Sequence, residues 1–139
     1  MSPRLVYVGN FRPDHSTEND VRRAFEHLGW EVTRVQESDF IEAARRATRE
    51  VAPKWSTIVA RSLDADLVLH TMTQGSYPPE TVLGLWDVLR AHGVPTASIH
   101  LDLFYGLSSP KDSGPQRCDL PRLHPMFRVD HVFTADGDH

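Results

Sequence analysis

The clearest indication of the fold lies in residues 4–20, Arg4-Leu5-Val6-Tyr7-Val8-Gly9-Asn10-Phe11-Arg12-Pro13-Asp14-His15-Ser16-Thr17-Glu18-Asn19-Asp20. The apolar run over residues 4–8 does not alternate, which is typical of a strand covered by helices on both faces. After a polar loop, apolar residues recur at the spacing of one helix face, at Val21, Ala24, Phe25 and Leu28. Thr17 and Asp20 resemble a capping box, and Gly29 stands where the helix would end. The stretch predicts the first β-loop-α unit of a parallel sheet.

Strand-like and helix-like segments alternate along the rest of the chain. Four further apolar segments predict strands, over residues 30–35, 66–70, 95–100 and 131–134. Segments at helical spacing lie between them, near residues 39–51, 55–62 and 80–92. This order predicts an α/β fold: one Rossmann-like domain over residues 1–139, with a mainly parallel sheet of about five strands and helices on both faces.

One long segment breaks the alternation. Residues 103–125 are rich in Pro, Ser, Gly and Asp and show no sustained period. A loop of this length inside a compact domain is usually functional or disordered. We therefore predict a mobile loop over these residues, placed to act as a flap over a ligand site.

The composition disfavours several classes of protein. The net charge is -4, and the basic residues are scattered, so the electrostatic footprint of a nucleic-acid-binding protein is missing. The one cysteine, Cys118, cannot form an internal disulfide. The chain does not open on a basic segment followed by a long apolar one, and no apolar stretch approaches the roughly 20 residues that cross a bilayer. We expect a cytoplasmic protein with no nucleic-acid partner and no membrane span.

The first loop does not have the sequence of a cofactor-binding turn. Ligands of open parallel sheets bind beyond the carboxyl ends of the strands, near the point where the strand order reverses. Gly9 is followed by no second or third glycine before the helix, so the dinucleotide fingerprint is absent, and a Walker phosphate loop is absent as well. Glu18 and Asp20 in the first helical turn would also repel a pyrophosphate. We expect no nicotinamide or flavin cofactor in this chain.

His15 is the residue of the first loop best suited to catalysis. An imidazole titrates near neutral pH and can take a proton from a hydroxyl, although most loop histidines are not catalytic. Asp102 follows the fourth strand, and if the first and fourth strands are neighbours, its carboxylate could orient His15. The alternative for Asp102 is a turn residue that bonds its own backbone.

Two other chemistries have less support. Six residues invite a metal site but lack a recognised ligand spacing: His100, Asp102, His131, Asp136, Asp138 and His139. We therefore predict no metal. Cys118 lies in the irregular segment without a local base, which disfavours it as a nucleophile. Tyr77, Phe104 and Tyr105 fall in loops at the expected ligand side, where aromatic rings suit sugars or flat bases.

A family resemblance is carried by four segments taken together. They are residues 5–11 (Leu5-Val6-Tyr7-Val8-Gly9-Asn10-Phe11), residues 15–19 (His15-Ser16-Thr17-Glu18-Asn19), residues 94–102 and residues 127–137. In their order and spacing these segments resemble the N-terminal half of a GT-B glycosyltransferase, of the broad group called family 1 or family 4. The resemblance covers nearly the whole chain, although no single motif in it is diagnostic.

The resemblance implies two Rossmann-like domains that face a cleft. The N-terminal domain of such enzymes mainly receives the acceptor, and the C-terminal domain binds the nucleotide sugar. By position, His15 and Asp102 match the base and its supporting acid in inverting members. A small-molecule or glycan acceptor would then contact residues at the strand ends: Asn10, Phe11, Ser16, Thr17, Thr73, Tyr77, His100 and Tyr105.

The sequence departs from this family where it stops, at His139. A linker and a donor-binding domain would follow in the family, so we expect a nucleotide sugar to bind only with a second domain. The leading hypothesis is the acceptor-side domain of a nucleotide-sugar-dependent glycosyltransferase, incomplete for catalysis by itself. The alternative is a non-catalytic Rossmann-like binding or interaction module that docks a partner or forms a homodimer. A third hypothesis is a small metal-dependent hydrolase that uses His15 and Asp102.

Overall fold

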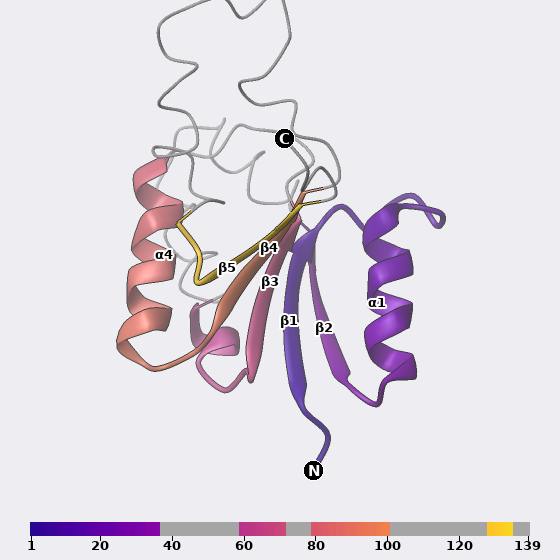
Figure 1. Cartoon of the computed structure of the whole chain (residues 1–139), viewed down its shortest axis with the longest axis horizontal. Coiled ribbons are helices and arrows are strands. Elements are labelled where there is room, and N and C mark those ends of the chain that lie inside the picture. The colour runs from indigo at the N-terminus through magenta and orange to yellow at the C-terminus, as the bar shows by residue number, and fades with distance from the viewer. Residues whose placement is uncertain (37–58, 72–78, 101–127, 135–139) are drawn as a thin grey trace, which may run out of the picture.

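The computed structural model describes residues 1–36, 59–71, 79–100 and 128–134, of which residues 79–83, His100 and Thr134 are described by their backbone alone. These ranges contain one sheet of five parallel strands in the order β2-β1-β3-β4-β5 (Figure 1). The strands are β1 (Arg4–Gly9), β2 (Glu31–Gln36), β3 (Leu67–Thr71), β4 (Thr96–His100) and β5 (His131–Thr134). Two helices have described bounds, α1 (Thr17–His27) and α4 (Pro79–Ala91).

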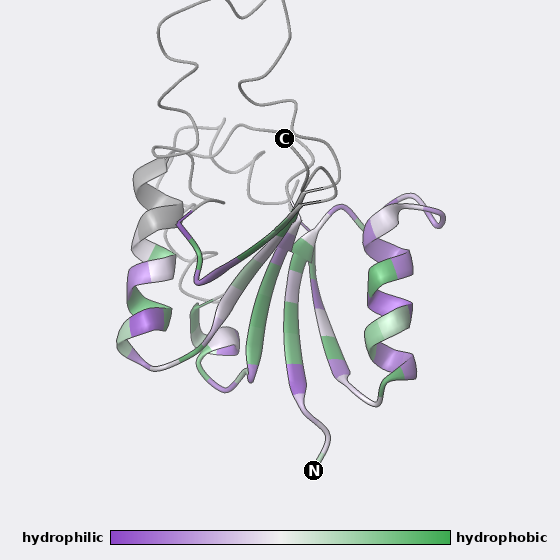
Figure 2. Ribbon diagram, in the orientation of Figure 1, coloured by the Kyte–Doolittle hydropathy of each residue, from purple (hydrophilic) through white to green (hydrophobic). Residues whose placement is uncertain are grey.

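The predicted α/β class is confirmed, and the predicted strands lie within one residue of the observed bounds. Residues 59–62, in the predicted helical segment before β3, are helical. The rest of that segment, the one near residues 39–51 and the predicted loop over residues 103–125 lie outside the described residues. Buried parallel strands are easy to recognise because they are apolar on both faces, and Figure 2 shows β1 and β3 as predominantly hydrophobic.

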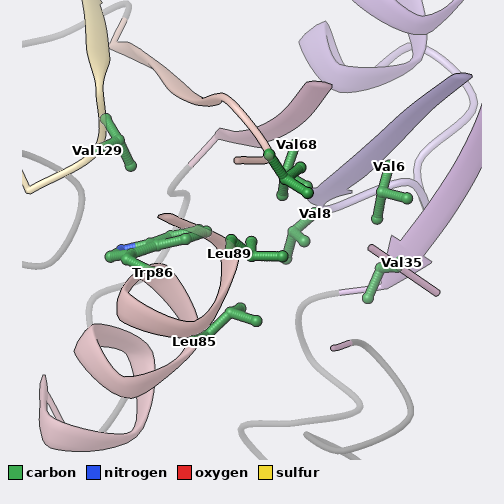
Figure 3. Packing of buried hydrophobic residues seen from close by; sticks show 9 residues of the cluster. Val6, Val8, Val35, Val68, Leu85, Trp86, Leu89 and Val129 are labelled. Atoms are coloured by element: carbon green, nitrogen blue, oxygen red, sulfur yellow. The ribbon is translucent and has the colours of Figure 1, made fainter. Parts of the chain in front are cut away.

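The sheet separates two apolar clusters, each covered by helix. On one face α4 packs against the sheet; its Leu89 points toward Val8, whereas its Trp86 extends toward the side of Val129 (Figure 3). The whole cluster on that face consists of Val6, Val8, Val35, Val68, Leu85, Trp86, Leu89, Val94 and Val129. On the opposite face α1 covers a second cluster, Leu5, Tyr7, Phe11, Leu69 and Ala97. Alternate residues of β1 belong to opposite clusters, as the pleat of a strand requires, so helices cover both faces as predicted.

Helix α1 begins at a different cap from the predicted one. Ser16 is the N-cap, with an extended backbone, and its side chain accepts a hydrogen bond from the backbone N–H of Asn19 at 3.2 Å. The predicted capping box of Thr17 and Asp20 is therefore wrong by one residue. Serine and threonine are both good caps, and the pattern alone does not say which of two adjacent hydroxyl residues leaves the helix.

The end of α1 follows the prediction at Gly29 and departs from it at Leu28. Gly29 has a φ of +88°, and the N–H of Trp30 donates to the carbonyl of Phe25 at 3.0 Å, as in a Schellman motif. The rings of Phe25 and Trp30 meet edge to face, 5.4 Å between centroids. Trp30 thus fills the space beside Phe25, while Ala24 is exposed and Leu28 is 73% exposed, contrary to the predicted apolar face.

The edge strand β5 is joined to β4 by a reciprocal set of hydrogen bonds. The backbone N–H and the hydroxyl of Thr96 donate to Oδ2 of Asp130 at 2.9 and 3.0 Å, and the N–H of Asp130 donates back to the Thr96 hydroxyl at 3.0 Å. Burial acts to raise the pKa of Asp130, but these bonds and the charges of Arg90 and His131 outweigh it and hold that pKa below its ordinary value. The charged carboxylate therefore stabilises the start of β5.

Candidate functional site

The strand order places a switch point between β1 and β3. The connection from β1 to β2 and the connection from β2 to β3 run in opposite directions, because β2 and β3 pair with opposite edges of β1. Doubly wound sheets bind ligands outside the carboxyl ends of the strands at such a point. The candidate site is therefore built from the ends of β1 and β3 and from residues 10–16, the first loop.

The premise that the first and fourth strands are neighbours is wrong. β3 lies between β1 and β4, so the two strands are separated by about 10 Å, two strand spacings. The direct pairing of His15 with Asp102 loses its geometric basis, and Asp102 itself lies outside the described residues. The sequence pattern identifies strands, but it does not say on which side of the sheet each crossover places the next one.

The buried side chain of Asn19, in the first turn of α1, holds the first loop in one conformation. Its Nδ2 donates to the carbonyl oxygens of Phe11 and Pro13, each at 2.9 Å, and lies 3.1 Å from the hydroxyl of Ser16. Its Oδ1 accepts from Nε of Arg22 at 3.2 Å. Asn19 is 4% exposed, so both ends of a buried amide are hydrogen-bonded, which stabilises one conformation of the loop.

The predicted residues at the end of this loop and at the start of α1 have the exposure that a ligand contact needs. His15 and Thr17 are exposed and Ser16 is half-buried. Within the described ranges no hydrogen bond or ion pair ties the His15 side chain to the rest of the protein. His15 thus projects into solvent from a backbone that Asn19 fixes.

Asn10 and Phe11 are connected to β2 through Gln36. Gln36 pairs in register with Gly9, the last residue of β1. Its Oε1 accepts a hydrogen bond from the backbone N–H of Phe11, and its Nε2 donates to Oδ1 of Asn10, both at 2.9 Å. Asn10 is half-buried, whereas Phe11 is buried. Phe11 is therefore a core residue of the loop, and its role in acceptor binding stays a prediction.

A buried pair of hydroxyls joins the two strands of the switch point. The phenol oxygen of Tyr7 lies 2.6 Å from Oγ1 of Thr71, and the ring of Phe11 packs edge to face on Tyr7, 5.0 Å between centroids. Tyr7 is fully buried. Burial raises the pKa of the Tyr7 phenol above its ordinary value, the hydrogen bond with Thr71 lowers it by less, and the charge of Glu18 raises it further. Tyr7 is a neutral hydrogen-bonding group at neutral pH.

Glu18 fills the space beside the end of β1. A Cβ added at Gly9 would lie 2.8 Å from Cγ of Glu18, so the glycine is needed for this close approach. Glu18 is 3% exposed, and its Oε1 is buried with no hydrogen-bond partner among the described residues. Asp20, the other acid of the first turn, is exposed and pairs with Arg23 at 2.8 Å. The glycine thus makes room for a carboxylate side chain, the opposite of what a phosphate-binding turn does.

Several predicted residues cannot be placed. Thr73, Tyr77, Asp102, Tyr105 and Cys118 lie outside the described residues, and His100 ends β4 with only its backbone described. Of the residues considered for a metal, His131 is exposed on the edge strand β5. The described parts of the chain contain no group of three or more His, Cys, Asp or Glu that could hold a metal ion.

Among the described helices, none is both long and apolar enough to cross a membrane.

The site also contains residues that the sequence did not single out. Tyr7, Thr71 and Gln36 act through contacts with segments far away in the chain, 64 residues apart for the hydroxyl pair. The one local signal was Tyr7, a hydroxyl-bearing ring inside an otherwise aliphatic strand. Asn19 gave no signal, because an asparagine in a first helical turn is read as an ordinary surface residue.

Comparison with known proteins adds a distant likeness. No family model matches the chain, and no curated protein matches it. A similar solved structure is the glutaminase domain of CTPS from Trypanosoma brucei with bound acivicin, at 16% sequence identity and a TM-score of 0.46. The match covers 71% of this chain and 36% of that chain, so this chain corresponds to little more than a third of it. A likeness of this size carries no argument about function.

Proposed function

We propose that this chain is the acceptor-side domain of a nucleotide-sugar-dependent glycosyltransferase. The observation that carries the proposal is the first loop: a buried Asn19 fixes its backbone at the switch point, while His15 stands exposed on its outer side. A pre-formed loop with an exposed imidazole suits a group that must meet a substrate hydroxyl in a defined geometry. The resemblance of residues 5–11 and 15–19 to the GT-B family supplies the class of reaction.

The surroundings of Gly9 support a domain that receives an acceptor instead of a nucleotide. Glu18 occupies the space against the glycine and leaves a buried carboxylate oxygen there. A diphosphate placed at this helix start would meet that negative charge at short range, which is unfavourable in a buried setting. The nucleotide sugar then belongs to a second, donor-binding domain, which the proposal requires.

His15 is the proposed base. Its imidazole would take the proton of the acceptor hydroxyl as that oxygen bonds to the anomeric carbon of the donor and the bond from that carbon to the diphosphate breaks. Asp102 remains the proposed supporting acid, but only if the chain after β4 reaches across β3 toward the first loop. The half-buried Ser16 and the exposed Thr17 are the proposed acceptor contacts next to His15.

The test uses the longest reading frame that contains this chain, assayed for release of nucleoside diphosphate from a panel of nucleotide sugars. His15→Ala should lower turnover by about two to four orders of magnitude, the usual contribution of a general base. His27→Ala is the matched control, because His27 is an exposed histidine in the last turn of α1, at the opposite end of the helix from the first loop. Equal activities of the two variants would contradict the role of His15, and failure of the reading frame to use any nucleotide sugar would contradict the proposed function.

One observation favours the alternative, a non-catalytic interaction module. The edge strand β5 carries exposed apolar side chains, with Phe133 59% and Val132 38% exposed, and exposed apolar groups on an edge strand suit association with a partner or a second copy. Sedimentation of the chain distinguishes the cases. A dimer that Phe133→Lys converts to a monomer supports the module, whereas a monomer at all concentrations removes homodimerisation from consideration.

A further inference from the structure

The orientation of the Asn10 amide is fixed by a chain of hydrogen bonds with a defined direction. A backbone N–H can only donate, so the atom of Gln36 that lies 2.9 Å from the N–H of Phe11 must be its oxygen. The opposite end of the same amide is then Nε2, which can also only donate. It lies 2.9 Å from the Asn10 side chain, whose facing atom must therefore be Oδ1.

It follows that Asn10 presents its Nδ2 to the outside. Asn10 is half-buried at the carboxyl end of β1, and the described residues offer no acceptor to its Nδ2. The position of Gln36 is set in turn by its register opposite Gly9. Gln36, a residue of β2, thus decides which end of the Asn10 amide faces the site.

We propose that Asn10, oriented by Gln36, determines which ligand groups the first loop accepts, and that it selects oxygens that can only accept a hydrogen bond, as in the carboxylate of an acidic saccharide. This inference rests on the proposed function for the saccharide nature of the ligand. A hydroxyl can accept or donate and so fits either end of an amide, whereas a carboxylate oxygen fits only the N–H end. Hydrogen bonds to a charged oxygen are also stronger than those to a neutral one. Gln36 is a positioning residue, and Asn10 is the residue that contacts the ligand.

The substitution Gln36→Glu reverses this arrangement at nearly constant shape. One carboxylate oxygen continues to accept from the N–H of Phe11, and the second now faces Asn10. Two oxygens cannot hydrogen-bond to each other, so the Asn10 amide turns over and donates its Nδ2 inward. Its Oδ1 then faces the site and repels a ligand carboxylate. In Asn10→Asp the unchanged Gln36 still donates its Nε2 to one carboxylate oxygen, and the second carboxylate oxygen faces the site.

The experiment is a titration of the 139-residue chain, followed by the side-chain and backbone amide signals in two-dimensional NMR spectra. The two probes are sodium glucuronate and methyl α-D-glucopyranoside, one with a carboxylate and one without. In the unsubstituted chain glucuronate should shift the Asn10 side-chain amide signal. Gln36→Glu and Asn10→Asp should each weaken glucuronate binding about tenfold or more and glucopyranoside binding much less, because one charge-assisted hydrogen bond is lost.

Ala24→Glu is the control for charge, since it adds one negative charge on an exposed position of α1 away from the loop. It should leave both affinities within about twofold, because an exposed charge at that distance is screened by salt. The backbone spectrum reports whether each variant is folded, and Asn10→Asp keeps the test open if Gln36→Glu does not fold.

Two results would overturn the inference: no response of Asn10 to glucuronate in the unsubstituted chain, or glucuronate affinity that survives both substitutions. The outcome is separable from that of the proposed function. If the NMR pattern holds but the longer reading frame transfers no sugar, the binding preference stands and the glycosyltransferase proposal fails. If the longer reading frame transfers a sugar but glucuronate does not shift the Asn10 signal, the proposed role of Asn10 is contradicted and the proposed function is not.

Discussion

Replacement of Asn19 by aspartate separates the general behaviour of helix ends from the specific contacts of this loop. An acidic residue in the first turn of a helix ordinarily stabilises it by about 0.5 kcal/mol, through the helix dipole. In this protein the Nδ2 of Asn19 donates to two carbonyl oxygens at 2.9 Å. Asn19→Asp would place a carboxylate oxygen against both of them.

The expected loss of stability in Asn19→Asp follows from those two hydrogen bonds. Each contributes about 1 kcal/mol, and the new contact between oxygens is repulsive, so the net change is a loss of about 2 to 3 kcal/mol after the helix-dipole gain is subtracted. For a domain of this size such a loss lowers Tm by about 10 °C. Asn19→Ala removes the same bonds without the repulsion, and should be less destabilised than Asn19→Asp at pH 7.

The pH dependence supplies the sharper test. A carboxyl that faces two carbonyls has a folded-state pKa above its unfolded one, so its protonated form, which can donate, favours the folded protein at low pH. That contribution is lost as the pH rises through the folded pKa. The free energies of unfolding of the two variants, measured by urea denaturation with circular dichroism, should therefore converge between pH 7 and pH 4. An Asn19→Asp protein as stable as the unsubstituted one at pH 7, or a gap between variants that does not change with pH, would refute the reasoning.

Three further predictions concern the strands around the site. Tyr7→Phe and Thr71→Val should each cost about 1 to 2 kcal/mol, and the double variant should cost about 1 kcal/mol less than their sum in a double-mutant cycle; strictly additive losses would argue against the 2.6 Å bond. Gly9→Ala should cost about 1 to 3 kcal/mol, because the new Cβ would lie 2.8 Å from Cγ of Glu18, and Glu18→Ala in the same chain should recover part of it in thermal unfolding. Asp130 has a folded pKa below its ordinary value of 3.8, so its contribution is present above that pH and is lost as the pH falls through the folded pKa. Asp130→Asn should accordingly flatten the decline of stability with acid, and an unchanged acid profile would count against the Asp130–Thr96 link.

The elements of this fold could be predicted from sequence because their signals are local. A buried parallel strand is an apolar run, and a glycine after a helix marks its end, so β1 and the stop at Gly29 follow from adjacent residues. The exposure of Leu28 could not be predicted in this way. It depends on Trp30, which folds back onto Phe25 and takes the place that helical spacing assigned to Leu28.

The order of the strands and the buried hydrogen bonds of the site could not be predicted from the sequence, for a different reason. Whether β3 or β4 lies beside β1 depends on the side of the sheet toward which a crossover turns, and the lengths of the segments fit both. Asn19 and Gln36 act through hydrogen bonds whose partners are set by that same arrangement in space. His15 was named as a candidate catalytic residue from its residue type and its place after a strand; the structure shows that it is exposed, and its catalytic role stays a prediction.

The hydroxyl pair of Tyr7 and Thr71 limits how this protein can respond to a ligand. The pair bridges the two strands that border the switch point, and it is buried. To move β1 and β3 apart would break that bond and bring water to the Tyr7 ring, whereas an exposed side chain of the first loop such as His15 can reorient without either cost. The sheet therefore serves as a rigid support of constant width. A ligand of a different size would therefore be accommodated by exposed side chains such as His15 and not by a change in the spacing of β1 and β3.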